Sequence, residues 1–329
     1  MSRLIDQFDG LLFDLDGTVY AGGQAIEHAI ESINDAELPC IYVTNNASRA
    51  PEVVAEQLRG LGIGAASADS VLTSAQAALK LLRESIGGHK LLLLGSQSFR
   101  DLAEAEGYTL VDSADERPDA VVQGHNPDTG WRQLSEAALA IRAGVPYFAS
   151  NLDTTLPQER GLMVGNGSMV AAVVSATGVK PKSAGKPAPD MLRISAELAQ
   201  AKRPLVVGDR LDTDIQGGNA AGFKTLQVLT GVHGPRDVIA APAEQRPDYL
   251  AVDLRCLHDS VELISPGADL GFSAEFVDGE VQLQSTPMQV AGQPAWHAAL
   301  LAAAPVCWEH QTVSVKALDE KAKDAISSW

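Results

Sequence analysis

The chain has 329 residues, of which 45% are hydrophobic and 20% are charged. This composition is typical of a globular protein and argues against wholesale disorder. The length predicts two or three domains. The formal net charge of −17 argues against nucleic acid or an anionic membrane as a partner, because both require a basic surface.

The cysteines and the amino terminus bear on where the protein works. Cys40, Cys256 and Cys307 are far apart and form no C-x-x-C pair, which argues against a disulfide framework and against a zinc cluster. The amino terminus lacks the pattern of a signal peptide. The nearest candidate for a membrane span, residues 169–179, is shorter than the ~18 apolar residues required and is predicted to be a buried helix. We therefore expect a cytoplasmic protein with no membrane partner.

The first predicted element is an apolar strand that ends in two carboxylates. The segment from Leu11 to Val19 reads Leu-Leu-Phe-Asp-Leu-Asp-Gly-Thr-Val, and a short apolar run before a glycine turn is typical of a buried strand in a parallel sheet. Such sheets bind ligands beyond the carboxyl ends of their strands, where Asp14 and Asp16 lie. Two carboxylates that converge there require a cation or a proton, and Mg²⁺ prefers oxygen ligands. An acidic turn without a ligand is the alternative.

A second apolar strand, residues 40–43, ends in Thr44, Asn45 and Asn46. A hydroxyl group and backbone N–H groups at the end of a strand can form an anion site. Helices with apolar residues on one face are predicted around this strand, over residues 25–36, 51–61 and 75–84.

The stretch that follows Gly87-Gly88 is predicted to form an α/β layer of its own. Strands are predicted over residues 90–95, 120–124 and 146–149, and helices over residues 98–107 and 131–143. Asn151-Leu152-Asp153 follows the last of these strands.

Two more segments with charged residues follow. Lys186 lies between a glycine and a proline and offers a compact cation suited to phosphate. A third apolar strand, residues 204–208, ends in Asp209, with Asp212 and Asp214 shortly after it. Further elements are predicted as helices over residues 190–199 and 215–221 and as strands near Leu226 and Tyr249.

The chain changes character from Ser265 onward. Residues 272–283 alternate around an Asp-Gly pair, which predicts a β-hairpin. Helices are predicted over residues 294–304 and 317–327. Because about 65 residues are marginal for an independent core, we expect this segment to dock on the rest of the chain or to pair with a second copy in a homo-oligomer.

In this order, four segments resemble the motifs of the haloacid dehalogenase superfamily of Mg²⁺-dependent aspartyl-phosphate phosphatases: residues 11–19, 43–46, 185–187 and 208–215. The forms Val-Thr-Asn-Asn and Gly-Asp-Arg-x-x-Thr-Asp-Ile are similar to the branch of p-nitrophenylphosphatase-like, pyridoxal phosphate and phosphoglycolate phosphatases. That branch carries a large α/β cap between the second and third motifs, and the interval from Asn46 to Lys186 is long enough to hold one. The resemblance covers residues 8–264.

The resemblance implies an α/β fold with three parts. A Rossmann-like parallel sheet core would comprise residues 1–78 and 182–264. An inserted α/β cap, residues 79–181, would govern substrate specificity. Residues 265–329 would form a small C-terminal α+β appendage used for docking or dimerisation.

The resemblance also implies catalytic and metal-binding roles. Asp14 would be the nucleophile that forms an aspartyl phosphate. Asp16 would protonate the departing alcohol and then deprotonate the hydrolytic water. Mg²⁺ would be bound by Asp14, by the backbone carbonyl of Asp16 and by Asp209.

Other motif residues would bind phosphate. Thr44, the backbone N–H of Asn45 and Lys186 would neutralise charge on the phosphoryl oxygens. Asp214 would be an outer acid that orients water or Lys186, or else a carboxylate that stabilises a helix amino terminus.

His125 and Asn126 are candidate specificity residues. The family often has an aspartate at the position of His125, directly after a cap strand, and this departure would place His125 or Asn126 near the leaving group of the substrate. A solvent-facing loop histidine is the alternative.

The motifs predict a phosphatase. A dehalogenase would need neither Asp16 nor Asp209, and the large cap favours hydrolysis over phosphoryl transfer within a mutase. A cap that closes over the leaving group restricts the substrate to a small phosphorylated metabolite. Because no aromatic platform is evident, glycerol 3-phosphate is favoured, with phosphoglycolate, pyridoxal phosphate and sugar phosphates as alternatives. A phosphate-ligand sensor or scaffold that uses the C-terminal appendage is a second alternative.

Overall fold

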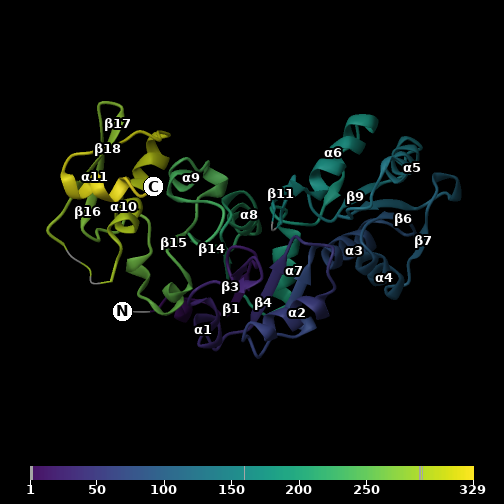
Figure 1. Ribbon diagram of the computed structural model, residues 1–329, viewed down its shortest axis with the longest axis horizontal. Coiled ribbons are helices and arrows are strands. Elements are labelled where there is room, and N and C mark those ends of the chain that lie inside the picture. The colour runs from purple at the N-terminus through teal and green to yellow at the C-terminus, as the bar shows by residue number, and fades with distance from the viewer. Residues whose placement is uncertain (1–2, 159, 289, 291) are drawn as a thin grey trace. The chain divides into compact units, whose positions relative to one another are not determined.

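The structure is a computed structural model and describes residues 3–158, 160–288, 290 and 292–329 (Figure 1). The chain forms two compact units. Unit 1 comprises residues 1–40 and 199–329, and unit 2 comprises residues 41–198. The predicted boundaries of core, cap and appendage remain a prediction.

Unit 1 is built on parallel strands. Strands β15 (Tyr249–Ala251), β14 (Lys224–Val228), β13 (Pro204–Gly208) and β1 (Gly10–Phe13) pair in parallel in that order. Every residue of β1 and β13 is buried, as expected of strands covered on both faces. Because β1 and β13 run in parallel register, the acidic segments that follow them leave the sheet at the same edge.

The other elements of unit 1 are short near the amino terminus and longer near the carboxyl terminus. They are β2 (Tyr20–Ala21), β3 (Gln24–Ala25), α1 (Ala29–Asn34), a π-helical turn (Leu211–Ile215), α8 (Gln216–Ala221), α9 (Pro235–Ile239), β16 (Phe272–Val277), β17 (Glu280–Ser285), α10 (Ala295–His310), β18 (Val315–Ala317) and α11 (Glu320–Ile326). The helix expected over residues 25–36 is shorter, because β2 and β3 form a hairpin and α1 begins only after His28.

The C-terminal segment forms a three-stranded sheet, β16-β17-β18, with α10 and α11 beside it (Figure 1). The predicted hairpin is confirmed as β16 and β17, and Asp278 and Gly279 both adopt positive φ at its turn. The helix expected over residues 317–327 was wrong at its start. Val315–Ala317 forms β18 instead, and α11 begins after Asp319, which accepts a hydrogen bond from the backbone N–H of Ala322.

Helix α10 runs further than the residues 294–304 expected for it. It continues through Pro305, which lacks the N–H that would bond to the carbonyl of Leu301. That carbonyl instead accepts a hydrogen bond from the backbone N–H of Gly267 at 2.7 Å. A tertiary partner therefore satisfies the group that the proline leaves open.

The C-terminal segment shares one hydrophobic core with the strands and helices of unit 1. Leu300, Leu301 and Leu283 are buried together with Val238 of α9 and Leu250 of β15. The indole N–H of Trp308 donates to the carbonyl of Val238 at 2.7 Å. The segment is therefore an integral part of unit 1.

His297 of α10 is a buried histidine held in one tautomer. Its Nε2 lies 2.9 Å from the carbonyl of Leu250, which can only accept, so Nε2 carries the hydrogen. Its Nδ1, 2.6 Å from Nε2 of Gln293, is then the acceptor. Burial lowers the pKa of His297 from 6.5 to about 4.

This histidine is expected to make unit 1 less stable in mild acid. Because the unfolded chain takes up the proton near pH 6.5 and the folded chain only near pH 4, stability falls as the pH falls through this window. The free energy of unfolding should drop by about 2 kcal/mol more between pH 7 and pH 5 in the wild type than in His297→Gln. Urea unfolding at both pH values checks this, and equal pH dependence in the two proteins would contradict it.

Unit 2 contains a parallel sheet in the order β12-β9-β8-β6-β7 and, apart from it, a parallel pair, β4 and β5. Its elements are β4 (Cys40–Thr44), α2 (Pro51–Gly60), β5 (Val71–Thr73), α3 (Ser74–Ser85), β6 (Lys90–Leu94), α4 (Gln97–Ala105), β7 (Thr109–Val111), β8 (Ala120–Gln123), α5 (Trp131–Arg142), β9 (Tyr147–Ala149), β10 (Thr155–Gln158), β11 (Gly161–Val164), α6 (Asn166–Thr177), β12 (Lys182–Ser183) and α7 (Asp190–Leu198). The predicted strands and helices of this region are confirmed to within a few residues.

One prediction in unit 2 was wrong. The apolar segment 169–179 was expected to be a buried helix, but α6 buries only one face, through Val170 and Val173, and leaves Ala171 and Ala172 exposed. A run of small apolar residues does not reveal which side of a helix is covered. Among the helices of the described residues, none is long and apolar enough to cross a bilayer.

Candidate active site

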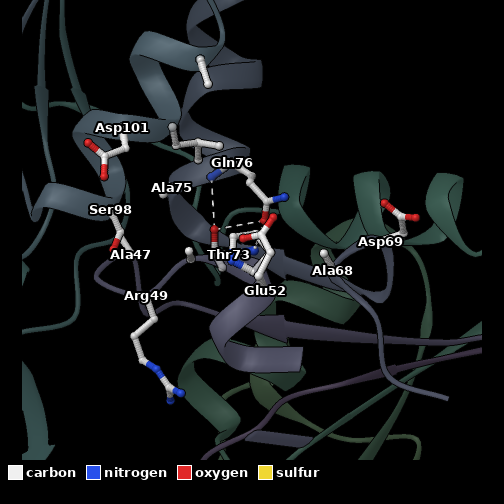
Figure 2. A pocket seen from close by; sticks show the side chains of 14 residues that line it. Ala47, Arg49, Glu52, Ala68, Asp69, Thr73, Ala75, Gln76, Ser98 and Asp101 are labelled. Atoms are coloured by element: carbon white, nitrogen blue, oxygen red, sulfur yellow. Dashed lines mark hydrogen bonds between the residues drawn. The ribbon is translucent and has the colours of Figure 1, made fainter. Parts of the chain in front are cut away.

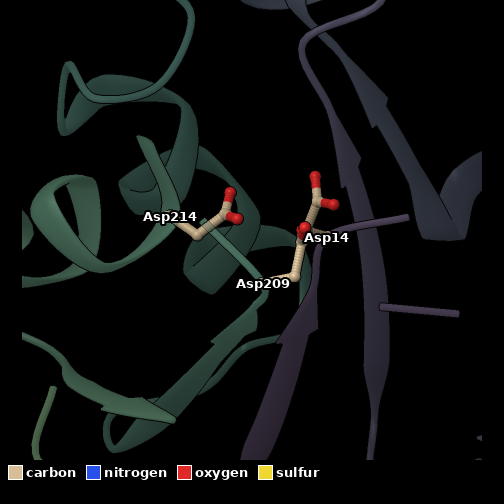
Figure 3. Close-up of side chains that lie close together, drawn as sticks. All are labelled: Asp14, Asp209 and Asp214. Carbon is tan, nitrogen blue, oxygen red and sulfur yellow. The ribbon is translucent and has the colours of Figure 1, made fainter. Parts of the chain in front are cut away.

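Three carboxylates meet at the carboxyl ends of β1 and β13 (Figure 3). Asp14 follows β1, Asp209 follows β13, and Asp214 lies in the π-helical turn. One oxygen of each lies within 4.8 Å of the others, and Asp209 and Asp214 are buried. The strand register explains the pairing, because the backbone N–H of Asp14 donates to the carbonyl of Val207 at 2.8 Å.

The carboxylate of Asp209 is held by its surroundings. The backbone N–H of Val232 donates to its Oδ2 at 2.7 Å, and Nε2 of Gln227 donates to its backbone carbonyl at 2.6 Å. Gly17 lies directly against it: a Cβ at Gly17 would fall 2.4 Å from Oδ2 of Asp209, and Gly17 has a φ of +90°. Only glycine fits this position.

Asp214 belongs to the cluster that the sequence placed only in its surroundings. Its Oδ2 accepts a hydrogen bond from the backbone N–H of Arg210 at 3.1 Å. The expected pairing of Arg210 with a neighbouring acid is confirmed, because its guanidinium donates to both oxygens of Asp212 at 3.0 and 2.9 Å. Burial opposes the charge on Asp212, but Arg210 holds the pKa of Asp212 below its usual value.

The acid cluster fits a hard divalent cation. Its donors are carboxylate oxygens, the ligands that Mg²⁺ and Ca²⁺ prefer, and carboxylates this close require a cation or a shared proton. Asp16 lies outside this cluster, and its side chain is exposed on the loop that pairs it with Tyr20. Its roles as a carbonyl ligand and as the acid and base remain predictions.

In unit 2, the side chain of Asn45 connects segments far apart in sequence. Its Nδ2 donates to the carboxylate of Asp153 at 3.1 and 3.2 Å and to the carbonyl of Lys186 at 3.0 Å. Its Oδ1 accepts from the backbone N–H of Lys186 at 2.9 Å. The sequence predicted a role only for the backbone N–H of Asn45, whereas its side chain fixes the backbone on both sides of the lysine.

Lys186 and Thr44 are buried beside the same strand. Nζ of Lys186 donates to the carbonyl of Val43 at 3.2 Å, and only 2% of this lysine is exposed. The hydroxyl of Thr44 accepts a hydrogen bond from the backbone N–H of Asn46 at 3.1 Å. The structure thus brings Thr44, Asn45 and Lys186 together at the end of β4.

Asp153 and Asn151 are site residues that the predicted site omitted. Asn151 donates to the carbonyl of Asn45 at 2.7 Å, and the carboxylate of Asp153 accepts from the side chain of Asn45. The signal available in the sequence was the Asn-x-Asp pattern after the strand that became β9.

The two candidate specificity residues lie in the loop after β8. The amide of Asn126 is used within unit 2: Nδ2 donates to the carbonyl of Gly95 at 3.1 Å, and Oδ1 accepts from the backbone N–H of Asp128 at 3.0 Å. His125 is half-buried. The specificity role of both residues remains a prediction.

A cavity of about 380 Å³ lies among α2, α3 and α4 (Figure 2). None of the predicted site residues lines it. Thr73 and Gln76, at its wall, bond to one another at the start of α3: the backbone N–H of Thr73 donates to Oε1 of Gln76 at 2.8 Å, and the backbone N–H of Gln76 donates to the hydroxyl of Thr73 at 3.3 Å. These polar groups serve helix capping.

Known proteins match the chain along its length. A family model described as haloacid dehalogenase-like hydrolase matches residues 11–109, and a second, described as HAD-hydrolase-like, matches residues 183–257. The chain is 41% identical to D-glycerol 3-phosphate phosphatase of Mycobacterium tuberculosis, over 100% of this chain and 96% of that protein.

Solved structures agree. The crystal structure of glycerol phosphate phosphatase from Mycobacterium tuberculosis in complex with magnesium has a TM-score of 0.94 and 41% identity, over 100% of this chain and 99% of that one. A double mutant of a thermostable NPPase from Geobacillus stearothermophilus has a TM-score of 0.68 and 32% identity, over 75% of this chain and 97% of that one. The α/β fold with a cap is thereby confirmed. The chain belongs to the haloacid dehalogenase superfamily of phosphatases, in the branch of the p-nitrophenylphosphatases.

Proposed function

We propose that this phosphatase hydrolyses glycerol 3-phosphate through an aspartyl phosphate on Asp14, with Mg²⁺ bound at the acid cluster. The observation that carries the proposal is the meeting of Asp14, Asp209 and Asp214 at one edge of the sheet. The substrate follows the relative that matches the whole chain, which is named for D-glycerol 3-phosphate.

The chemistry begins with Asp14. Its carboxylate attacks phosphorus, the bond from phosphorus to the glycerol oxygen breaks, and Asp16 gives a proton to that oxygen. Asp16 then accepts a proton from the water that attacks the aspartyl phosphate, which releases phosphate and restores Asp14.

Other residues stabilise charge and hold ligands in place. Asp14, the backbone carbonyl of Asp16 and Asp209 would hold Mg²⁺, which supplies positive charge opposite the phosphoryl oxygens. Thr44, the backbone N–H of Asn45 and Lys186 would bind the same oxygens. The network of Asn45 supports this role of Lys186, because it fixes the lysine backbone. Asp214 would orient water or ligands next to Asp209.

The remaining expectations belong to the same proposal. His125 and Asn126 would contact the leaving group, and the cap would admit small phosphorylated metabolites. We also propose a cytoplasmic location and a homo-oligomeric state.

Phosphate release from a panel of metabolites tests the proposal. The panel contains both enantiomers of glycerol 3-phosphate, phosphoglycolate, pyridoxal phosphate and glucose 6-phosphate, each assayed with Mg²⁺ and with a chelator. We expect the highest kcat/KM for a glycerol 3-phosphate, its loss on chelation and its recovery with added Mg²⁺. A higher kcat/KM for another metabolite would refute the substrate, and release unaffected by chelation would refute the metal-dependent mechanism.

A further inference from the structure

The loop between β14 and α9, residues 229–234, contacts both segments of the acid cluster. The hydroxyl of Thr230 donates to the carbonyl of Gly17 at 2.7 Å, in the loop that follows Asp14 and Asp16. Two residues further on, the backbone N–H of Val232 donates to Oδ2 of Asp209 at 2.7 Å. One short loop therefore ties the segment after β1 to the segment after β13.

Gln227, at the end of β14, adds a third connection. Its Nε2 donates to the backbone carbonyl of Asp209 at 2.6 Å and to that of Val228 at 3.1 Å. The side chain is fully buried, and its Oε1 has no hydrogen-bond partner among the described residues. A buried, unpaired amide oxygen costs stability. The position therefore carries this cost together with a contact that fixes the backbone of Asp209.

The loop backbone packs tightly against the carboxylate. A Cβ at Gly231 would lie 2.0 Å from Oδ2 of Asp209 and 2.4 Å from its Cγ. The loop can approach this closely only because residue 231 has no side chain. As a result, a shift of the loop must move the carboxylate of Asp209.

Both ends of the loop are anchored in the core of unit 1. The backbone N–H of Leu229 donates to the carbonyl of Ala251 at 3.0 Å, and the Leu229 side chain packs against the shared core. At the other end, α9 begins at Pro235 and its Val238 is buried in the same core. The loop is therefore a fixed support for the cluster.

We propose that Thr230 and Gln227 are positioning residues for cation binding at the acid cluster. Gln227 orients the Asp209 backbone, and Thr230 holds the loop whose Asp16 carbonyl would be a ligand. Hydrogen bonds of this kind, made to the groups around a metal ligand, set the affinity of the site. The inference rests on the proposed function, because it requires that Asp209 binds Mg²⁺.

Mg²⁺ binding by the full chain, measured by titration calorimetry without substrate, tests this inference. Thr230→Val keeps the shape of the side chain and removes the donor, and it should weaken Mg²⁺ binding by about tenfold. Gln227→Leu should do the same. Thr230→Ser, which keeps the hydroxyl, should bind within about threefold of wild type. The matched control is Ser265→Ala, which removes a 2.8 Å hydroxyl bond to the carbonyl of Val261 elsewhere in unit 1.

Further measurements separate this inference from the proposed function. The Mg²⁺ concentration for half-maximal phosphatase activity should rise in Thr230→Val and Gln227→Leu, with KM for glycerol 3-phosphate unchanged at saturating Mg²⁺. If Asp209→Asn loses Mg²⁺ binding while both positioning variants bind as wild type does, the inference fails and the proposed function stands. A lower Tm in these variants without weaker Mg²⁺ binding also overturns the inference. If Asp209→Asn binds Mg²⁺ normally, the metal assignment itself fails.

Discussion

Asp14→Asn is expected to lower kcat for phosphate release by about 10⁴-fold or more, because an amide of the same shape cannot form the aspartyl phosphate. Asp14 is the cluster member that follows β1 directly, and its backbone is held to β13 through the carbonyl of Val207. The substitution keeps the volume and removes one charge from the cluster, so the Tm should change little. Single-turnover phosphate release at saturating Mg²⁺ and substrate gives the measurement.

A matched control separates loss of the nucleophile from loss of any nearby acid. Asp212→Asn makes the same change on a carboxylate that pairs with Arg210 and lies outside the acid cluster. We expect its kcat within about threefold of wild type, as is usual for an exposed pair. If Asp14→Asn retains a tenth or more of wild-type kcat, another group is the nucleophile and the proposed mechanism is wrong.

Lys186→Met is expected to have the second-largest effect, a fall in kcat/KM of about 10²–10³-fold, because a preorganised cation that offsets phosphoryl charge is lost. Lys186 is almost fully buried, and its backbone is fixed by the side chain of Asn45. Methionine retains much of the apolar stem, so packing is largely kept. Steady-state kinetics with glycerol 3-phosphate, together with Tm, checks the result.

The chain offers a matched lysine in the same unit. Lys80 is partly exposed and pairs with Glu197 at 2.9 Å. Lys80→Met should leave kcat/KM within about twofold of wild type, as expected for a surface ion pair. Should folded Lys186→Met keep kcat/KM within threefold of wild type, the proposed phosphate-binding role of Lys186 would be refuted.

Much of the fold was predictable because its signals are local. The apolar runs before Asp14 and Asp209 predicted β1 and β13, and the rule for parallel strands predicted that their acids lie at one edge. The Asp278-Gly279 pair predicted the hairpin of β16 and β17, since those residues favour the positive φ that the turn requires. Sequence patterns failed where a tertiary partner decides, as at Pro305, where Gly267 takes up the free carbonyl of Leu301.

The candidate site divides in the same way. Asp14, Asp209 and Lys186 were identified from their place after predicted strands or in recognisable motifs. The side-chain contacts of Asn45 with Asp153 and Lys186 were not, because they join residues 108 and 141 positions apart. The supporting bonds of Thr230 and Gln227 were missed for the same reason, since neither residue belongs to a motif.

The sequence by itself determined the α/β class, the family and the residues that carry its chemistry, because strand patterns and motif spacing are properties of neighbouring residues. Only the tertiary structure decided that Asp214 joins the acid cluster, that α6 is half exposed and that the C-terminal segment shares the core of unit 1. These features depend on which distant segments pack against one another. Such packing is selected by the fit of whole surfaces, and no local pattern records it.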